Sequence, residues 1–156
     1  MIGNAKYYLG GCNGGSPTII QMYSYERKIA NTTSNEFYYG SNPNSWVGKI
    51  GLMYVSDYGY ASANCETKKL YDTETTDLRA CNDTNWLYNE KEREWLLNQY
   101  SHNSETVYIV IEDGSITNNE APVVIPIKFR PVLYLRSEVK ITGGSGTVDD
   151  MYTLGL

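Results

Sequence analysis

The sequence predicts a single α+β domain, residues 1–156, with a mixed, twisted antiparallel sheet, short helices and long irregular loops. Its 156 residues match the usual size of one domain and suffice to bury a hydrophobic core. Residues after Ser104 alternate in the manner of strands, whereas residues 64–85 are rich in Asp, Glu, Thr and Asn and favour short helical turns. Strands and helical turns in separate parts of the chain indicate the α+β class.

The first half of the chain contains three apolar segments separated by loops. Residues 7–9 predict a short strand that the following glycines end, and residues 19–26 fit a short helix or a strand. The Asn-, Ser- and Gly-rich residues 31–46 predict a loop. Residues 46–55 alternate well enough to form one strand, and residues 56–61 then turn the chain.

Strand patterns dominate the second half. Residues 106–111 predict a strand that ends at a Glu-Asp-Gly-Ser turn, residues 112–115, and a second strand begins at Ile116. Residues 123–127 and 132–135 supply further strands, punctuated by prolines. The expected core residues are large and apolar: Trp46, Trp86, Trp95, Leu97, Val107, Val132 and Leu133.

Charge and hydropathy disfavour two classes of partner. Thirteen basic against 18 acidic side chains give a net charge of -5, which offers no basic surface for a phosphate backbone, so no nucleic acid is expected. No run approaches the ~20 apolar residues that cross a bilayer, so this chain is not expected to contact a membrane. The chain enters residues 7–9 without a signal peptide, as an ectodomain does when an upstream anchor has been removed.

The aromatic residues are dominated by tyrosine. Fifteen tyrosines against two phenylalanines favour a recognition surface, because tyrosine gives large rigid contact area while its hydroxyl stays compatible with water. The alternative is that tyrosine fills strands of a small β-rich domain, where aromatic residues are favoured. The sequence leaves both interpretations open.

The three cysteines favour one disulfide. Cys65 and Cys81 lie 16 positions apart in a polar stretch, and a bridge between them would stabilise the fold by roughly 3 kcal/mol. Cys12 is then a thiol or pairs with another chain. Such a bridge implies an extracellular setting, whereas three reduced thiols would indicate the cytosol.

Candidate catalytic groups are few. His102 is the only histidine, and its neighbour Ser101 in sequence says nothing about geometry, so a hydrolase is disfavoured. Glu90, Glu92 and Glu94 could pair as two carboxylates for glycosidic cleavage, but the basic residues between them favour a solvated loop. We therefore expect no enzymatic activity and no cofactor.

Two further segments resemble binding motifs weakly. Residues 143–146, Gly-Gly-Ser-Gly, lack the lysine and the helix of a phosphate loop and predict a tight turn. Asp113, Asp149 and Asp150 carry oxygens suited to calcium, but without the carboxylate spacing of a calcium loop. With one histidine and no Cys-x-x-Cys pair, no metal site is expected.

Several segments resemble a known group of proteins over nearly the whole chain. They are residues 7–11, 21–27 and 48–61, Cys65, Cys81, residues 85–87, residues 130–147 (RPVLYLRSEVKITGGSGT) and residues 152–155. In this order they resemble the ectodomains of pilin-like surface proteins of gut Firmicutes, which carry a prepilin-type helix ahead of this region. Residues 130–147 are also similar to the end of C-type-lectin-like domains related to the formylglycine-generating enzyme fold, including variable proteins diversified by retroelements.

This resemblance implies a C-type-lectin-like fold and an extracellular, non-enzymatic ligand-binding domain at the cell surface. Its expected partner is a protein or glycan on another cell or host; the alternative is a structural subunit that contacts neighbouring pilin-like subunits in a type IV pilus-like filament. The chain departs from the group at Lys128-Phe129. Members of the group have a small or aliphatic residue, preceded by a glycine, before the Arg-Pro pair. It also has no cysteine after Cys81, whereas formylglycine-generating activity depends on paired cysteines in the C-terminal part.

The expected binding face lies between residues 97 and 129. Its polar side chains stand on and beside a predicted hairpin, and in the diversified relatives the variable positions lie in this same C-terminal portion. The candidate ligand-binding residues are Tyr100, Ser101, His102, Asn103, Tyr108, Ser115, Thr117, Asn118 and Asn119. The alternative is an ordinary polar hairpin without a ligand.

Overall fold

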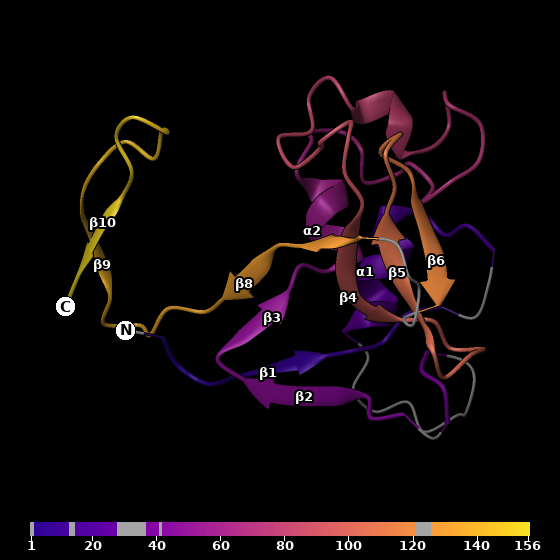
Figure 1. Cartoon of the computed structure of the whole chain (residues 1–156), viewed down its shortest axis with the longest axis horizontal. Coiled ribbons are helices and arrows are strands. Elements are labelled where there is room, and N and C mark those ends of the chain that lie inside the picture. Colours follow the sequence, from indigo (N-terminus) through magenta and orange to yellow (C-terminus); the bar gives the residue numbers. More distant parts are fainter. Residues whose placement is uncertain (1, 13–14, 28–36, 41, 121–125) are drawn as a thin grey trace.

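The chain folds into a sheet-rich body from which its C-terminal residues extend as an arm (Figure 1). The computed structural model describes residues 2–12, 15–27, 37–40, 42–120 and 126–156. Within them strands outnumber helices, and the α+β class predicted from the sequence is confirmed. None of the helices in this part of the chain has the length and apolar character needed to cross a bilayer.

The elements follow one another in a mostly β order. The strands are β1 (Ala5–Tyr8), β2 (Ser45–Gly48), β3 (Ile50–Leu52), β4 (Glu94–Gln99), β5 (Thr106–Val110), β6 (Ile116–Glu120), β7 (Lys128–Phe129), β8 (Pro131–Leu133), β9 (Lys140–Gly143) and β10 (Thr153–Gly155). The helices are α1 (Ile19–Glu26), α2 (Val55–Tyr60) and the 3-10 helix η1 (Leu78–Cys81).

A four-stranded sheet organises the body. Its order is β6-β5-β4-β7, antiparallel except for the parallel pair β4 and β7, so the sheet is mixed as predicted. β5 and β6 form the expected hairpin, and Gly114 in its turn has a φ of 85°, which favours glycine. The strand predicted over 123–127 falls largely on residues 121–125, outside the described residues.

Helix α1 resolves the ambiguity left by the sequence. Thr18 caps its N-terminus, because the Gln21 backbone N–H donates to the Thr18 hydroxyl and the Gln21 side chain accepts from the Thr18 backbone. Ile19, Met22 and Glu26 are buried along one face, at the spacing of a helix rather than a strand. The capping box and this face together fix the helix.

The strand predicted over residues 46–55 is wrong in its second half. Residues 45–48 pair with β1, whereas residues 50–52 turn away and pair with β8. Residues 55–60, predicted as part of that strand and a turn, form α2 instead. The backbone N–H of Tyr54 donates to the Asp57 carboxylate at 2.9 Å, and that of Val55 donates to Asn98 at 2.8 Å, so side chains satisfy the first amides of the helix.

The predicted core is also largely wrong, although Val132 packs against the buried cluster. Trp46, Trp86 and Leu133 are 50%, 78% and 40% exposed. The other four predicted residues, Trp95, Leu97, Val107 and Val132, are only partly buried. In β4 the buried side chains include Leu96 and Asn98, so the predicted residues of this strand lie on its opposite face. The buried cluster instead comprises Cys12, Ile19, Met22, Met53, Val55, Tyr58, Ala61, Leu70, Leu78, Leu87, Leu96, Tyr108, Val110 and Ile116.

The predicted disulfide between Cys65 and Cys81 is confirmed. It joins the irregular segment after α2 to the end of η1, which are connected by turns rather than by a sheet. Cys12 is buried, and its Sγ lies 2.9 Å from the hydroxyl of Tyr108. The bridge therefore stabilises an irregular part of the body.

Alkylation combined with intact-mass measurement tests this bridge. In the denatured protein, reduction before alkylation is expected to add two labels, at Cys65 and Cys81, to those that the unreduced protein takes up. Peptide mapping assigns the labels to the two residues. Equal labelling with and without reductant would contradict the bridge.

Candidate ligand-binding site

The residues predicted to bind a ligand divide into exposed and buried groups. His102 and Asn118 are exposed, and Tyr100, Asn103, Thr117 and Asn119 are partly buried. The structure brings some of them together: the ring of Tyr100 lies 5.8 Å from that of His102. Whether these six residues bind a ligand stays a prediction.

Three of the predicted residues do not lie at the surface. Ser101 and Tyr108 are 0% and 3% exposed, and Ser115 is buried as well. The Tyr108 side chain points to the core, where its hydroxyl lies within hydrogen-bond distance of the Cys12 Sγ. The Ser115 hydroxyl donates to Asp113 at 2.7 Å within the hairpin turn. The expected surface placement of these three side chains is corrected: they support the hairpin from inside.

A different surface forms an apolar groove of about 620 Å³. Helix α2 contributes Tyr60 to its wall, the segment before β4 contributes Trp86, and Tyr134 follows directly after β8. Met53, Leu87 and Val132 are among the apolar side chains that line it. Its volume and its mainly apolar lining are typical of ligand sites.

The aromatic walls of the groove are supported from behind. The Tyr60 ring meets the edge of Tyr23 with centroids 6.1 Å apart, and the Arg27 guanidinium lies 4.5 Å from the centroid of Tyr23. On the other side, the Tyr134 ring lies 5.6 Å from the buried ring of Tyr7. These ring and cation–π contacts restrict both tyrosines, so little side-chain entropy is lost when a ligand binds.

Charged groups lie at the groove and are held in place. Asp57 accepts from the Tyr54 backbone and lies 3.8 Å from the guanidinium of Arg27. Arg130 donates to the Glu94 carboxylate at 2.7 Å. The groove thus offers one carboxylate and one guanidinium in fixed positions beside the aromatic faces.

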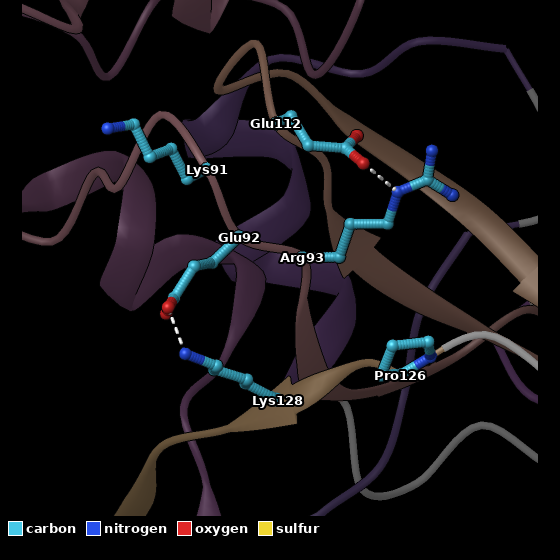
Figure 2. A pocket seen from close by; sticks show the side chains of 6 residues that line it. All are labelled: Lys91, Glu92, Arg93, Glu112, Pro126 and Lys128. Carbon is cyan, nitrogen blue, oxygen red and sulfur yellow. Dashed lines mark hydrogen bonds and ion pairs between the residues drawn. The ribbon is translucent and has the colours of Figure 1, made fainter.

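A second pocket, of about 480 Å³, is lined by charged side chains (Figure 2). Arg93 donates to Glu112 at 2.6 Å, which lowers the pKa of that carboxyl, and Lys128 pairs with Glu92. Figure 2 shows the two ion pairs on opposite sides of the pocket, with Lys91 turned away from both. A charged ligand would have to compete with these pairs, so this pocket is the weaker candidate.

Each of the three candidate glutamates lies in an ion pair, and Glu94 is buried in β4 rather than in the expected solvated loop. Glu92 pairs with Lys128 and Glu94 with Arg130, so each carboxylate serves an ion pair. The tight turn predicted at residues 143–146 is wrong: Gly143 ends β9, and residues 144–146 lie in the longer loop 144–152 that joins β9 to β10. Within the described ranges, no group of three or more His, Cys, Asp and Glu side chains could hold a metal ion.

One buried carboxyl has a strongly shifted pKa. Burial raises the pKa of Glu26 to about 7, although hydrogen bonds from Ser56 and the charge of Arg27 act in the opposite direction. Its carboxylate accepts from the hydroxyl and backbone N–H of Ser56 and, at 3.2 Å, from the amide of Asn98. With an exposure of 0%, Glu26 connects α1, α2 and β4 and does not face a ligand.

Sequence reasoning missed the groove because its walls come from three distant segments. Trp86 and Leu133 were assigned to the core on size and hydrophobicity, and nothing in the sequence places Tyr60 beside them. The polar neighbours of Trp86 give no signal of its exposure, because Asn85 beside it is buried. Comparison with known proteins adds no assignment: no protein-family model, curated protein or solved structure matches the chain.

Proposed function

We propose that the chain is a non-enzymatic, extracellular ligand-binding domain of a bacterial pilin-like surface protein, with a C-type-lectin-like fold, and that its ligand binds in the aromatic groove. The observation that carries this proposal is the convergence of Tyr60, Trp86 and Tyr134 on one apolar groove. Trp86 is 78% exposed, and a large apolar ring in water is costly unless a partner covers it. Aromatic residues of this kind dominate binding energy at interfaces.

The groove chemistry suits a glycan or a protein segment on another cell or host. Aromatic faces contact the apolar faces of sugar rings as well as apolar side chains, and the fixed Asp57 and Arg130 can hydrogen-bond hydroxyl or amide groups. The disulfide supports an extracellular location, because such bonds persist in oxidising compartments. The resemblance to diversified variable proteins supports a role in recognition.

Binding arrays of glycans and of surface proteins, probed with the domain and two variants, test this proposal. Trp86→Ala is expected to weaken binding to the hit by roughly 30-fold, as a central aromatic anchor does. Trp46→Ala is the matched control, because it removes another exposed tryptophan, on β2 and outside the groove. Both variants should melt near the wild-type temperature, since neither side chain is in the core.

Two results would contradict the proposal. One is a hit whose affinity is equally insensitive to both tryptophan variants, which would place the ligand elsewhere. The other is the absence of any hit. A variant with His102→Ala and Asn118→Ala tests the face expected from the sequence: if only this variant loses binding, the hairpin and not the groove is the site.

The alternative, a structural subunit of a type IV pilus-like filament, is favoured by a different observation. Apolar side chains of the C-terminal residues are exposed, including Val148 and Leu156 at 91% and 83%. In a filament such residues would be covered by neighbouring subunits.

A further inference from the structure

The C-terminal residues 137–156, which we call the arm, lie apart from the body (Figure 1). Their strands β9 and β10 pair with each other and, among the described strands, with no third strand. The hairpin exposes Ile141, Val148 and Met151, and Leu156 follows it. An isolated two-stranded hairpin is marginally stable in water, so this one needs a surface to pack against.

The body carries a second exposed apolar surface, formed by residues 2–8 and 45–52, which we call the wing. Trp46 and Val47, which are neighbours on β2, expose one apolar side chain on each face of this strand, and Ile50 on β3 is about half exposed as well. Within the described part of the chain, β2 pairs with β1 alone and therefore has a free edge. An apolar surface beside a free strand edge is a template for a further chain.

The charges of the two surfaces are opposite. Lys6 and Lys49, both exposed, are the charged residues of the wing, which contains no acid. The arm carries three acids, Glu138, Asp149 and Asp150, and one base, Lys140, which give it a net charge of -2. The basic wing and the net acidic arm are therefore complementary.

We propose that the arm of one copy docks on the wing of a second copy, with Asp149 near Lys49. The arm has 20 residues, and a standard interface uses about 20–30 residues from each partner. The chain contacts its own wing at Leu135, which bridges Ile2, and the arm then extends away from the body, so an arm does not cover its own wing (Figure 1). A docked pair leaves one free arm and one free wing, so the association is head-to-tail and can continue beyond two copies.

This inference concerns residues outside the groove and stands independently of the proposed ligand. Sedimentation velocity of the whole chain from about 1 to 200 µM at low salt is expected to show growth with concentration. Added salt should weaken the association, because the paired charges are exposed and screened. A chain that sediments as a monomer over this whole range would overturn the proposal.

Charge reversal identifies the two surfaces. Lys49→Glu and Asp149→Lys are each expected to weaken self-association by about 10-fold, because each brings like charges together. Mixed in equal amounts, the two variants should associate as the wild type does, since every arm then meets a wing of opposite charge. Trp86→Ala should leave the association unchanged.

Lys91→Glu and Glu90→Lys are the matched controls. They make the same changes of net charge at exposed positions outside both surfaces, and they should alter association by less than about 2-fold. Equal effects of the controls and the wing and arm variants would overturn the proposal, as would a mixture no more associated than its separate components. Circular dichroism checks that each variant is folded.

Discussion

Replacing Asn98 with alanine is expected to lower the free energy of unfolding by about 4 kcal/mol. Asn98 is completely buried, its carbonyl accepts from the Val55 backbone at 2.8 Å, and its amide donates to the Gly10 carbonyl at 2.7 Å and to Glu26. Alanine leaves the Val55 N–H and the Gly10 carbonyl buried and without this partner, at a cost of about 1–3 kcal/mol each, whereas Glu26 keeps its bonds to Ser56. Urea unfolding measures the difference.

Asn118→Ala is the matched control for this prediction. Asn118 lies in β6 of the same sheet but is exposed, so its loss should change the free energy of unfolding by less than about 0.5 kcal/mol. A cost below about 1 kcal/mol for Asn98→Ala would mean that water or a shifted backbone satisfies the freed groups. Asn98 would then not join the N-terminal segment, α1 and α2 to the sheet.

Asn98 also explains why the core could not be assigned from the sequence. Trp95, Leu96 and Leu97 are consecutive apolar residues, so alternation along β4 does not decide which of them face inward. The inward face is the one that carries Leu96 and Asn98, and it is selected by the partners of Asn98 in three other segments. Such long-range hydrogen bonds leave no mark in a local pattern.

Local signals, by contrast, were sufficient where local chemistry decides the structure. Two cysteines in a polar stretch predicted the disulfide, and the Glu-Asp-Gly-Ser turn predicted the hairpin of β5 and β6. The capping box of Thr18 and Gln21 was also readable and would have decided between helix and strand for residues 19–26. The groove had no comparable signal, because α2 and β8 meet only in the folded chain.

The second large effect concerns pH. Glu26 has a pKa of about 7 in the fold, against an ordinary value of 4.5, because burial disfavours its charged form. A raised pKa means that the unfolded chain gives up this proton more readily. The contribution of protonated Glu26 to the free energy of unfolding is therefore fully present below about pH 4.5. It is lost as the pH rises through about 7.

Burial, and not the groups around Glu26, sets the sign of this effect. Arg27 from the end of α1 and the Ser56 hydroxyl and amide from α2 favour the charged form, whereas Asp57 opposes it and Asn98 donates from β4. Burial outweighs the favourable contacts. The shift corresponds to about 3 kcal/mol between about pH 4.5 and pH 8.

Urea unfolding of the wild type and of Glu26→Gln at several pH values isolates this contribution. The wild type should lose about 2.5 kcal/mol relative to the variant as the pH rises from about 5 to 8, because glutamine has no proton to release. Subtracting the free energy of unfolding of the variant from that of the wild type cancels the contributions of the other titrating groups. Asp77 is one of them, and its lowered pKa makes the fold less stable as the pH falls in a more acidic range. A difference that stays constant over this range would mean that Glu26 keeps its ordinary pKa, and that Arg27 and Ser56 compensate its burial in full.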